Sequence, residues 1–140
     1  MNTDILLARR GPVIEEDLQG LFEAAWGERK CDFRPVLQRS FTWITAHAGE
    51  ELVGFVNVAW DGGVHFFLID TTVDPAWQRR GIGTRLVRDA IDACSGHGHW
   101  MHVDFAPELR GFYETAGFGL IENAGIASLG GVDRHSPNRP

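Results

Sequence analysis

Residues 73–86 constrain the fold of this chain more than any other segment. An apolar stretch over residues 64–73 ends at Pro75, and a loop with two arginines and two glycines follows it. From Ile82 onward, apolar residues recur with helical spacing and predict an amphipathic helix. A buried strand that is joined through a short loop to such a helix favours an α/β fold, in which the helix covers a sheet.

The rest of the chain supplies further strands and helices. Strands are predicted over residues 4–9, 41–48, 52–60, 64–73, 99–105, 118–122 and 125–129. Helices are predicted over residues 14–25, 82–94 and 107–116, and residues 28–39 are expected to be irregular or weakly helical. The almost unbroken apolar run in residues 64–69 is typical of a strand that is buried on both faces and therefore central in its sheet.

This order of elements predicts one domain over residues 1–129 with an α/β (α+β) fold. Its centre is expected to be a twisted, mixed and mostly antiparallel sheet of six to seven strands, with helices on both faces. Residues 130–140 are polar and rich in Gly and Pro, and we expect them to form a loose tail.

The composition argues against several classes of protein. The net charge of -6 and the lack of a basic stripe argue against nucleic-acid binding and favour a neutral or cationic substrate. No apolar run approaches the roughly 20 residues that span a bilayer, and the N-terminus has no signal-peptide pattern, so we expect no membrane partner. Cys31 and Cys94 lack metal-type spacing, and two cysteines are fewer than the disulfide framework of a secreted domain usually has, so we expect reduced thiols in the cytoplasm. His97 and His99 flank a glycine and indicate a turn rather than a metal site.

The loop before the helix that begins at Ile82 is suited to binding a diphosphate. The first amides of a helix lack internal partners and carry partial positive charge. Gly81 and Gly83 have no side chain that would keep a phosphate from the backbone, and Arg79 and Arg80 add positive charge. A dinucleotide-binding fold would need a third glycine, and a nucleotide P-loop would need Gly-Lys-Ser/Thr; the loop has neither. A plain helix start with solvated arginines is the remaining alternative.

Residues 78–83, Gln-Arg-Arg-Gly-Ile-Gly, match the pattern Q/R-x-x-G-x-G/A. Here the chain resembles the GNAT superfamily of N-acetyltransferases, in which this loop holds the pyrophosphate of coenzyme A. The resemblance implies acetyl-CoA as cosubstrate, bound by Thr72, Val73, Gln78, Arg79, Arg80, Gly81, Ile82, Gly83, Thr84 and Phe112. It also implies that the strand bulges and parts from its neighbour near Val73, where backbone N–H groups would polarise the thioester carbonyl.

Residues 112–118, Phe-Tyr-Glu-Thr-Ala-Gly-Phe, resemble the F-Y-x-x-x-G-F segment of the same superfamily. The resemblance implies that Tyr113 lies near the sulfur of acetyl-CoA and protonates the departing thiolate. A phenol suits this role because it stays protonated at neutral pH. The alternative is a structural tyrosine, because Tyr113 shares a helix face with Leu109, Phe112 and Ala116.

A general base is harder to assign. In some relatives a Glu or His partway along the central strand takes the amine proton, but the corresponding positions here hold Phe66 and Phe67. Asp70 is the candidate base. The other titratable groups nearby are His65, His102 and Asp104. Alternation along a strand places Asp70 and His65 on opposite faces unless a bulge intervenes.

The chain departs from the superfamily pattern after the next strand. Many members carry an asparagine there that contacts the cofactor, whereas residues 106–107 are Ala-Pro in this sequence. That contact is therefore not expected.

These features predict an acyltransferase that moves an acetyl group from acetyl-CoA to a primary amine, by direct transfer in a ternary complex. The amine would belong to a small molecule, a peptide or a protein, and no metal takes part. A non-catalytic acyl-CoA-binding or sensing domain is the first alternative, since no base is assigned. A structural module without a ligand is the second. The sequence leaves open whether the chain forms a homodimer.

Overall fold

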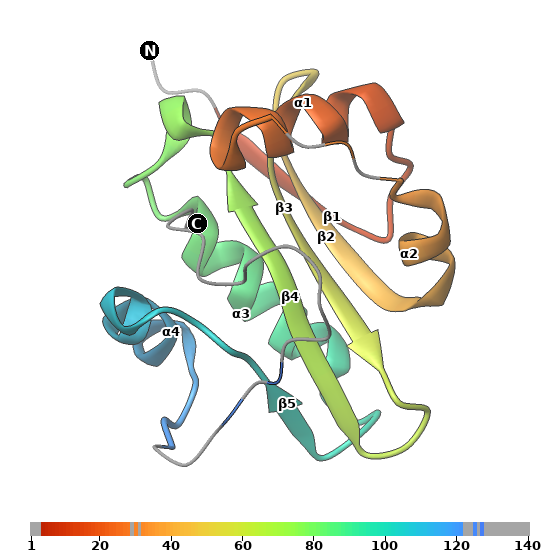
Figure 1. Ribbon diagram of the computed structural model, residues 1–140, viewed down its shortest axis with the longest axis vertical. Helices are drawn as coiled ribbons and strands as arrows, with labels where there is room; N and C mark the ends of the chain where they lie inside the picture. The colour runs from red at the N-terminus through yellow and green to blue at the C-terminus, as the bar shows by residue number, and fades with distance from the viewer. Residues whose placement is uncertain (1–3, 29, 31, 122–124, 126, 128–140) are drawn as a thin grey trace.

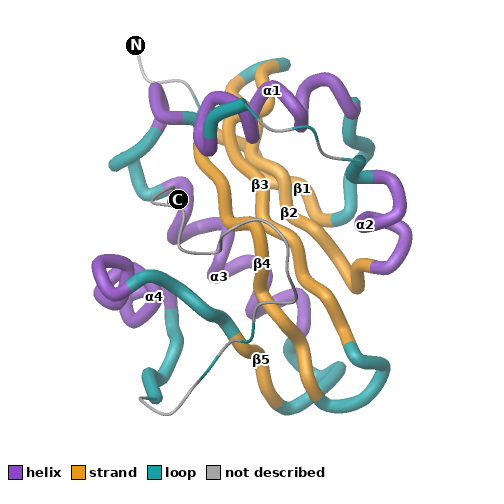
Figure 2. Tube along the Cα trace, in the orientation of Figure 1, coloured by secondary structure: helices purple, strands orange, loops and turns teal. Residues whose placement is uncertain are grey.

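The computed structural model describes residues 4–28, 30, 32–121, 125 and 127, which are arranged around one sheet (Figure 1). The strands are β1 (Ile5–Arg9), β2 (Ser40–Ala48), β3 (Glu51–Trp60), β4 (His65–Val73) and β5 (Trp100–His102). The helices are α1 (Glu15–Trp26), α2 (Arg34–Arg39), α3 (Ile82–Cys94) and α4 (Arg110–Ala116). Two short 3-10 turns are η1 (Pro75–Trp77) and η2 (Pro107–Leu109). Figure 2 shows the helices outside the sheet and the loops at its ends.

The sheet is mixed and has the strand order β1-β2-β3-β4-β5. Neighbours from β1 to β4 are antiparallel, whereas β5 runs parallel to β4. The prediction of six to seven strands is wrong for the described part of the chain, where the sheet has five. Residues 118–121, predicted as part of a sixth strand, instead follow the left-handed Gly117, and Phe118 N donates back to Tyr113 O at 3.0 Å. Most of the strand predicted over residues 125–129 lies outside the described residues.

Helices pack on both faces of the sheet. On one face, α3 presents an apolar side that is buried against the strands, as its sequence periodicity predicts. The buried residues on that side are Ile82, Leu86, Val87, Ala90 and Cys94. On the other face, residues of α1 pack with Phe33 and Phe55 in a second, smaller cluster. Among the described helices, none has both the length and the apolar character that crossing a membrane requires.

The strand that is buried on both faces is β3 rather than β4. All residues from 52 to 58 are buried in β3, which is paired on both edges and packs against α3 on one face and α1 on the other. Both helices also contact β4, but exposure alternates in the first part of that strand, where Phe67 is 41% exposed. The prediction that residues 64–73 are buried on both faces and form the central strand is therefore wrong, and β3 is the middle strand of the five. An apolar run predicts burial, but it does not show how far along a strand the covering helices reach.

A bulge interrupts β4 at Asp70. Phe55 of β3 pairs with Thr72, and Asn57 pairs with Ile69, so β4 has one more residue than β3 between these two pairs. Asp70 adopts a left-handed backbone conformation with φ +59°. An extra residue of this kind bends the strand and re-aims the side chains that follow it.

β4 and β5 stay together only at the beginning of β4. The three residues of β5 pair with residues 65–67, although a longer strand is predicted over residues 99–105. From Leu68 onward, β4 has no strand partner on this side within the described residues. Figure 1 shows β5 and the chain toward α4 leading away from the upper half of β4. Among the described residues, the edge of β4 from its middle toward the loop before α3 is therefore open in the sense that no strand lies beside it.

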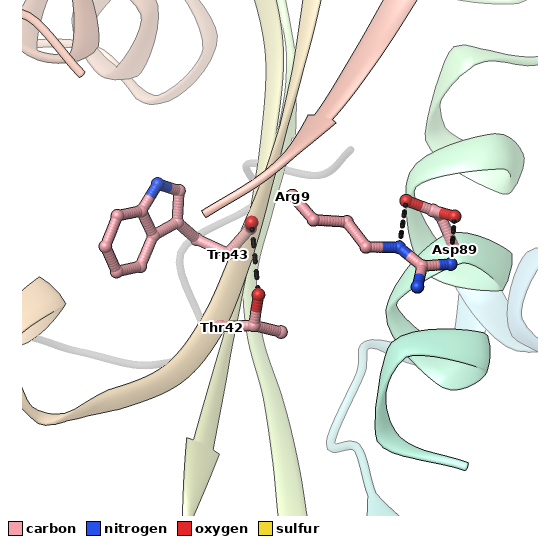
Figure 3. Close-up of polar contacts among 4 residues, drawn as sticks. All are labelled: Arg9, Thr42, Trp43 and Asp89. Atoms are coloured by element: carbon pink, nitrogen blue, oxygen red, sulfur yellow. Dashed lines mark hydrogen bonds and ion pairs between the residues drawn. The ribbon is translucent and has the colours of Figure 1, made fainter. Parts of the chain in front are cut away.

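The edge strand β1 is fastened to α3 by an ion pair. Arg9 donates from Nε to one carboxylate oxygen of Asp89 at 3.1 Å and from Nη2 to the other at 2.7 Å (Figure 3). Trp43 of β2 lies on the opposite side of the strands in the same view, and its Nε1 donates to Gly11 O at 3.0 Å. The edge strand β1 is thus attached to α3 on one face of the sheet, and the chain just after it is attached to Trp43 on the other face.

Candidate functional site

The loop between β4 and α3 is shaped by hydrogen bonds from its own side chains. Asp74 Oδ1 accepts from Ala76 N at 2.9 Å and caps η1. Gln78 Nε2 donates to Val73 O at 3.0 Å and ties the loop to the end of β4. The side chain of Gln78, which was predicted to bind the cofactor, is therefore used to shape the loop.

Gly81 is required by the backbone conformation at the start of α3. It has φ +81° and ψ +5°, a left-handed conformation that costs little only for glycine. A Cβ at this position would meet nothing within 4 Å, so the space beside the backbone is open. The neighbouring Arg79 is also left-handed, with φ +64°. The sequence prediction that Gly81 leaves the backbone accessible agrees with this geometry.

The first amides of α3 face no acceptor among the described residues. The bond from Arg85 N to Gly81 O, 3.1 Å long, is the first i→i−4 bond of the helix. The amides of Ile82, Gly83 and Thr84 precede it, and none of the three has a hydrogen-bond partner within the described residues. Three N–H groups at a helix start, with the positive end of the helix dipole, form a site that favours an anion.

Two exposed arginines lie beside these amides. The guanidinium of Arg80 lies 4.8 Å from the centre of the Trp77 ring, which gives that long side chain a defined position. Arg79 is likewise exposed. Val73 and Ile82 are buried in the core at 3% and 2% exposure, so only their backbone groups are available to a ligand. The loop therefore combines backbone donors and side-chain charge, as the sequence predicts for a diphosphate.

Gly83 also makes room for a side chain of α4. A Cβ at Gly83 would lie 3.1 Å from two carbons of the Phe112 ring and 3.6 Å from a methyl group of Val73. The missing side chain therefore lets Phe112 approach the helix start closely. Phe112 therefore packs against the first turn of α3 and links α4 to the loop.

Tyr113 combines a buried ring with a hydroxyl group that reaches the bulge of β4. The side chain is 4% exposed, and its ring stacks on Phe105 at 5.1 Å between ring centres. The rings of Phe112 and Phe118 meet it edge-on. The hydroxyl oxygen lies 3.5 Å from Thr71 Oγ1, at the long limit of a hydrogen bond. Tyr113 therefore does pack in the core, as the structural alternative expects, and its hydroxyl group is directed to β4.

The candidate bases lie in two separate places. Asp70 is exposed and forms the bulge directly before Thr71. His65 lies at the other end of β4, five residues away, or about 16 Å along a strand. There its Nδ1 lies 2.7 Å from His102 Nε2. Asp104 is exposed in the segment after β5. Asp70 is thus the residue directly before Thr71, whose Oγ1 contacts the Tyr113 hydroxyl, whereas His65 and His102 pair with each other at the other end of β4.

Near the bulge, sequence reasoning named Thr72 without its contact to α1, and it missed Asn57. Thr72 Oγ1 accepts from Trp26 Nε1 at 2.9 Å and donates to Asp70 O at 2.9 Å, so this hydroxyl connects α1 to the bulge. Asn57 of β3 is 1% exposed, and its Oδ1 has no hydrogen-bond partner within the described residues. Alternation places Asn57 on the α1 face, beside Ile69. The sequence signal that could have identified Asn57 is its position as a polar residue inside an apolar run.

The described histidines and Cys94 do not form a metal centre with one another. In the described part of the chain, no group of three or more His, Cys, Asp or Glu side chains could hold a metal ion. His97 N donates to Cys94 O at 3.0 Å, so residues 95–98 form the turn that the sequence indicates. Cys94 is a buried free thiol, and burial raises its pKa to about 11. Cys31 lies outside the described residues.

Known proteins share the sequence pattern and the fold. A profile of the Acetyltransferase (GNAT) family matches residues 12–118. The rice (Oryza sativa subsp. japonica) glucosamine 6-phosphate N-acetyltransferase 1 is 40% identical over 50 residues, which are 35% of this chain and 30% of that protein. The matching region therefore covers less than a third of the rice protein.

The overall arrangement of helices and strands is also that of solved acetyltransferase structures. A GNAT family acetyltransferase from Streptococcus pneumoniae has a TM-score of 0.75 at 24% identity, over 94% of this chain and 99% of that chain. An aminoglycoside N-acetyltransferase solved in complex with CoA has a TM-score of 0.73 at 18% identity, over 91% of this chain and 96% of that chain. These likenesses show the fold, and the family profile spans most of the sequence, including the loop and Tyr113. The chain therefore belongs to the Acetyltransferase (GNAT) family.

Proposed function

We propose that this protein transfers an acetyl group from acetyl-CoA to a primary amine. The observation that carries the proposal is the set of three unpaired amides, of Ile82, Gly83 and Thr84, at the start of α3. Together with the exposed Arg79 and Arg80, they would hold the diphosphate of the cosubstrate. Family membership supports the same cosubstrate, since a structural neighbour was solved with CoA.

The open edge of β4 supports a place for the reacting end of the cosubstrate. This edge begins where β5 ends and continues past Thr71 to the loop. Backbone N–H groups on this edge that face away from β3 can donate to an oxygen that gains charge during the reaction, which is a large term in acyl transfer. N–H groups alternate in direction along a strand, and Asp74 N donates to Val53 O of β3, so the N–H of Val73 faces this edge and would contribute. The N–H of Thr72 faces β3 and its hydroxyl is already bonded, so Thr72 would help to position the bulge.

Tyr113 is the proposed acid. In the reaction the amine nitrogen forms a bond to the acetyl carbon, the carbon–sulfur bond breaks, and the electron pair leaves with sulfur. The Tyr113 hydroxyl would give its proton to that sulfur and recover one from solvent. The amine proton would pass to water or to Asp70, whose carboxylate is exposed beside Thr71. Direct transfer within a ternary complex needs no covalent enzyme intermediate, which suits a site without an assigned nucleophile.

The acceptor is proposed only as a class. The net charge of -6 favours a cationic or neutral amine over an anionic one. The names of the rice relative and of the aminoglycoside N-acetyltransferase refer to amino sugars. An acceptor panel should therefore begin with a cationic aminoglycoside, should include glucosamine 6-phosphate as an anionic amino sugar, and should continue with amino acids, diamines and peptides.

Release of free thiol from acetyl-CoA, measured with and without each amine, tests the proposal. We expect thiol release that depends on an amine, a rise in the melting temperature with acetyl-CoA, and loss of both in Gly81→Asp, which places a carboxylate beside the amides. A protein that binds acetyl-CoA but releases no thiol with any amine of the panel would favour the non-catalytic binding domain. A melting temperature that acetyl-CoA leaves unchanged would refute the proposal.

A further inference from the structure

A groove lined with carboxylates lies outside the proposed acetyl-transfer site, between the first half of α1 and the turn that joins β2 to β3. It consists of two adjoining cavities of about 100 Å³ and about 270 Å³, which share Asp17, Glu50 and Leu52. The smaller cavity is also lined by Pro12, Val13, Ile14, Thr45 and His47. The larger one continues past Glu16, Gly20, Leu21, Glu51 and Asp74. Figure 1 shows α1 crossing the end of the sheet at which β4 finishes.

The lining of this groove is strongly negative. Its five carboxylates are Glu16, Asp17, Glu50, Glu51 and Asp74. No lysine or arginine lines either cavity, and none of the five carboxylates forms an ion pair with another described residue. Carboxylates gathered in a concave surface repel one another, and a cation bound between them would relieve that repulsion.

A buried hydroxyl group supplies an independent sign of a ligand. Thr45 lines the smaller cavity and is 1% exposed, and its Oγ1 has no hydrogen-bond partner within the described residues. Thr45 pairs with Phe55, which packs with α1, so the Thr45 side chain lies on the α1 face of the sheet. A buried polar atom that lacks a partner destabilises the fold. A ligand donor placed in the cavity would satisfy this oxygen.

The spacing of the carboxylates determines the kind of cation. They come from α1, the β2–β3 turn and the end of β4, and no group of them within the described residues could hold a metal ion. A single small ion would therefore leave most of the carboxylates in the groove without a nearby positive charge. A flexible chain with several ammonium groups separated by methylenes can reach successive carboxylates, and its methylenes can lie against Leu21 and Leu52.

We propose that this groove binds a linear oligoamine, with one terminal ammonium in the smaller cavity between Thr45 Oγ1, Asp17 and Glu50. The other ammonium groups lie along the larger cavity toward Asp74. Asp74 also caps the turn that leads to the α3 amides, so the bound amine lies beside the loop without occupying it. This site is separate from the acceptor site, and its occupancy does not depend on acetyl transfer.

Isothermal titration calorimetry with spermidine, in low salt and without acetyl-CoA, tests the proposal. We expect one saturable site on the wild-type protein and at least tenfold weaker binding to Glu50→Gln/Glu51→Gln. The control variant Asp92→Asn/Glu114→Gln removes the same charge from exposed positions on α3 and α4, and we expect it to bind as the wild type does. Spermidine binding that is unchanged in the groove variant, or equally weakened in the control variant, would overturn the proposal.

Thr45→Val provides a second variant that leaves the charge unchanged. Replacing a partnerless buried hydroxyl with a methyl group should keep or raise the free energy of unfolding. We expect this variant to bind spermidine at least fivefold more weakly, because one contact to the terminal ammonium is lost. Binding equal to the wild type would show that the ammonium does not reach Thr45 and would refute this placement. Acetyl-CoA should leave the affinity of the wild-type protein for spermidine within about threefold. Full competition would place the amine in the acetyl-CoA site and would overturn the proposal.

Discussion

The hydroxyl group of Tyr113 lies 3.5 Å from Oγ1 of Thr71, the residue that follows the left-handed Asp70 in β4. This contact joins α4 to the bulge across the open edge of β4. It depends on the bulge, because the extra residue in β4 changes which side chains face α4. The only tyrosine of the chain is therefore directed to the part of β4 where the proposed chemistry takes place.

Tyr113→Phe tests the role of this hydroxyl. If Tyr113 is the acid, turnover should fall by about 100-fold or more, because a positioned proton donor contributes at least that factor. The affinity for CoA should stay within about threefold, and the ring packing should be kept. Phe105→Leu is the control, because it removes the stacked ring and leaves the hydroxyl in place. Steady-state thiol release below the melting temperature gives the turnover and, through inhibition by added CoA, the affinity for CoA. Unchanged turnover in Tyr113→Phe would remove the acid role.

The parts of the fold that the sequence predicted well are those with strong local signals. The helix α3 shows its apolar period directly, and Gly81 marks the left-handed residue at its start. The burial of β3 was missed because Asn57 and Gly54 interrupt its apolar run. Position 54 holds a glycine where a Cβ would lie 2.9 Å from a side-chain carbon of Leu86, which is 32 residues further along the chain. Such long-range packing leaves no local pattern.

The candidate site was predictable to a similar degree. The sequence identified the loop and Tyr113 from short motifs, whereas the roles of Gly83 and Gln78 depend on Phe112 and on Val73 O. The bulge at Asp70 could not be predicted, because no residue pattern near it requires a left-handed aspartate. The sequence indicated only that a bulge would be needed to place Asp70 and His65 on the same face. The acidic groove combines segments far apart in the sequence, so composition could indicate its charge but not its place.

Gly83→Ala tests the contact between α3 and Phe112. The new Cβ would lie 3.1 Å from the ring, so the ring or the helix must shift. Gly111→Ala is the matched control, since it is also a helical glycine but has nothing within 4 Å of the new Cβ. Both changes gain the same helix propensity, so we expect Gly83→Ala to be less stable than Gly111→Ala by about 1–2 kcal/mol. Urea denaturation measures this difference, and equal stabilities would contradict the packing role.

The ion pair between Arg9 and Asp89 should contribute little to stability. Its side chains are 48% and 25% exposed, so water and salt weaken the attraction. A double-mutant cycle with Arg9→Ala and Asp89→Ala should give a coupling of up to about 1 kcal/mol, despite the bidentate geometry. We expect the coupling to shrink in 1 M salt. A coupling of several kcal/mol that salt leaves unchanged would show that the pair is a main link between β1 and α3.

Cys94 should resist alkylation in the folded protein. Burial raises the pKa of its thiol from 9.0 to about 11, so the reactive thiolate is scarce at pH 8. In a Cys31→Ser background, iodoacetamide should label the folded protein about 100-fold more slowly than the unfolded protein, from the thiolate fractions alone. Because the folded pKa is the higher one, this thiol stabilises the fold below pH 9 and loses that contribution as the pH rises toward 11. Equal labelling rates in the two states would contradict the burial of Cys94.

A titration of the isotopically labelled protein with CoA, followed by amide nitrogen–proton correlation spectra, tests the proposed diphosphate site most directly. We predict saturable shifts at the amides of Ile82, Gly83 and Thr84 that are among the largest in the protein and share one dissociation constant. Pantetheine, which lacks the diphosphate, should leave these three resonances nearly unchanged. If CoA binds while the three amides stay unmoved, the diphosphate is held elsewhere, and the proposal for this loop is wrong.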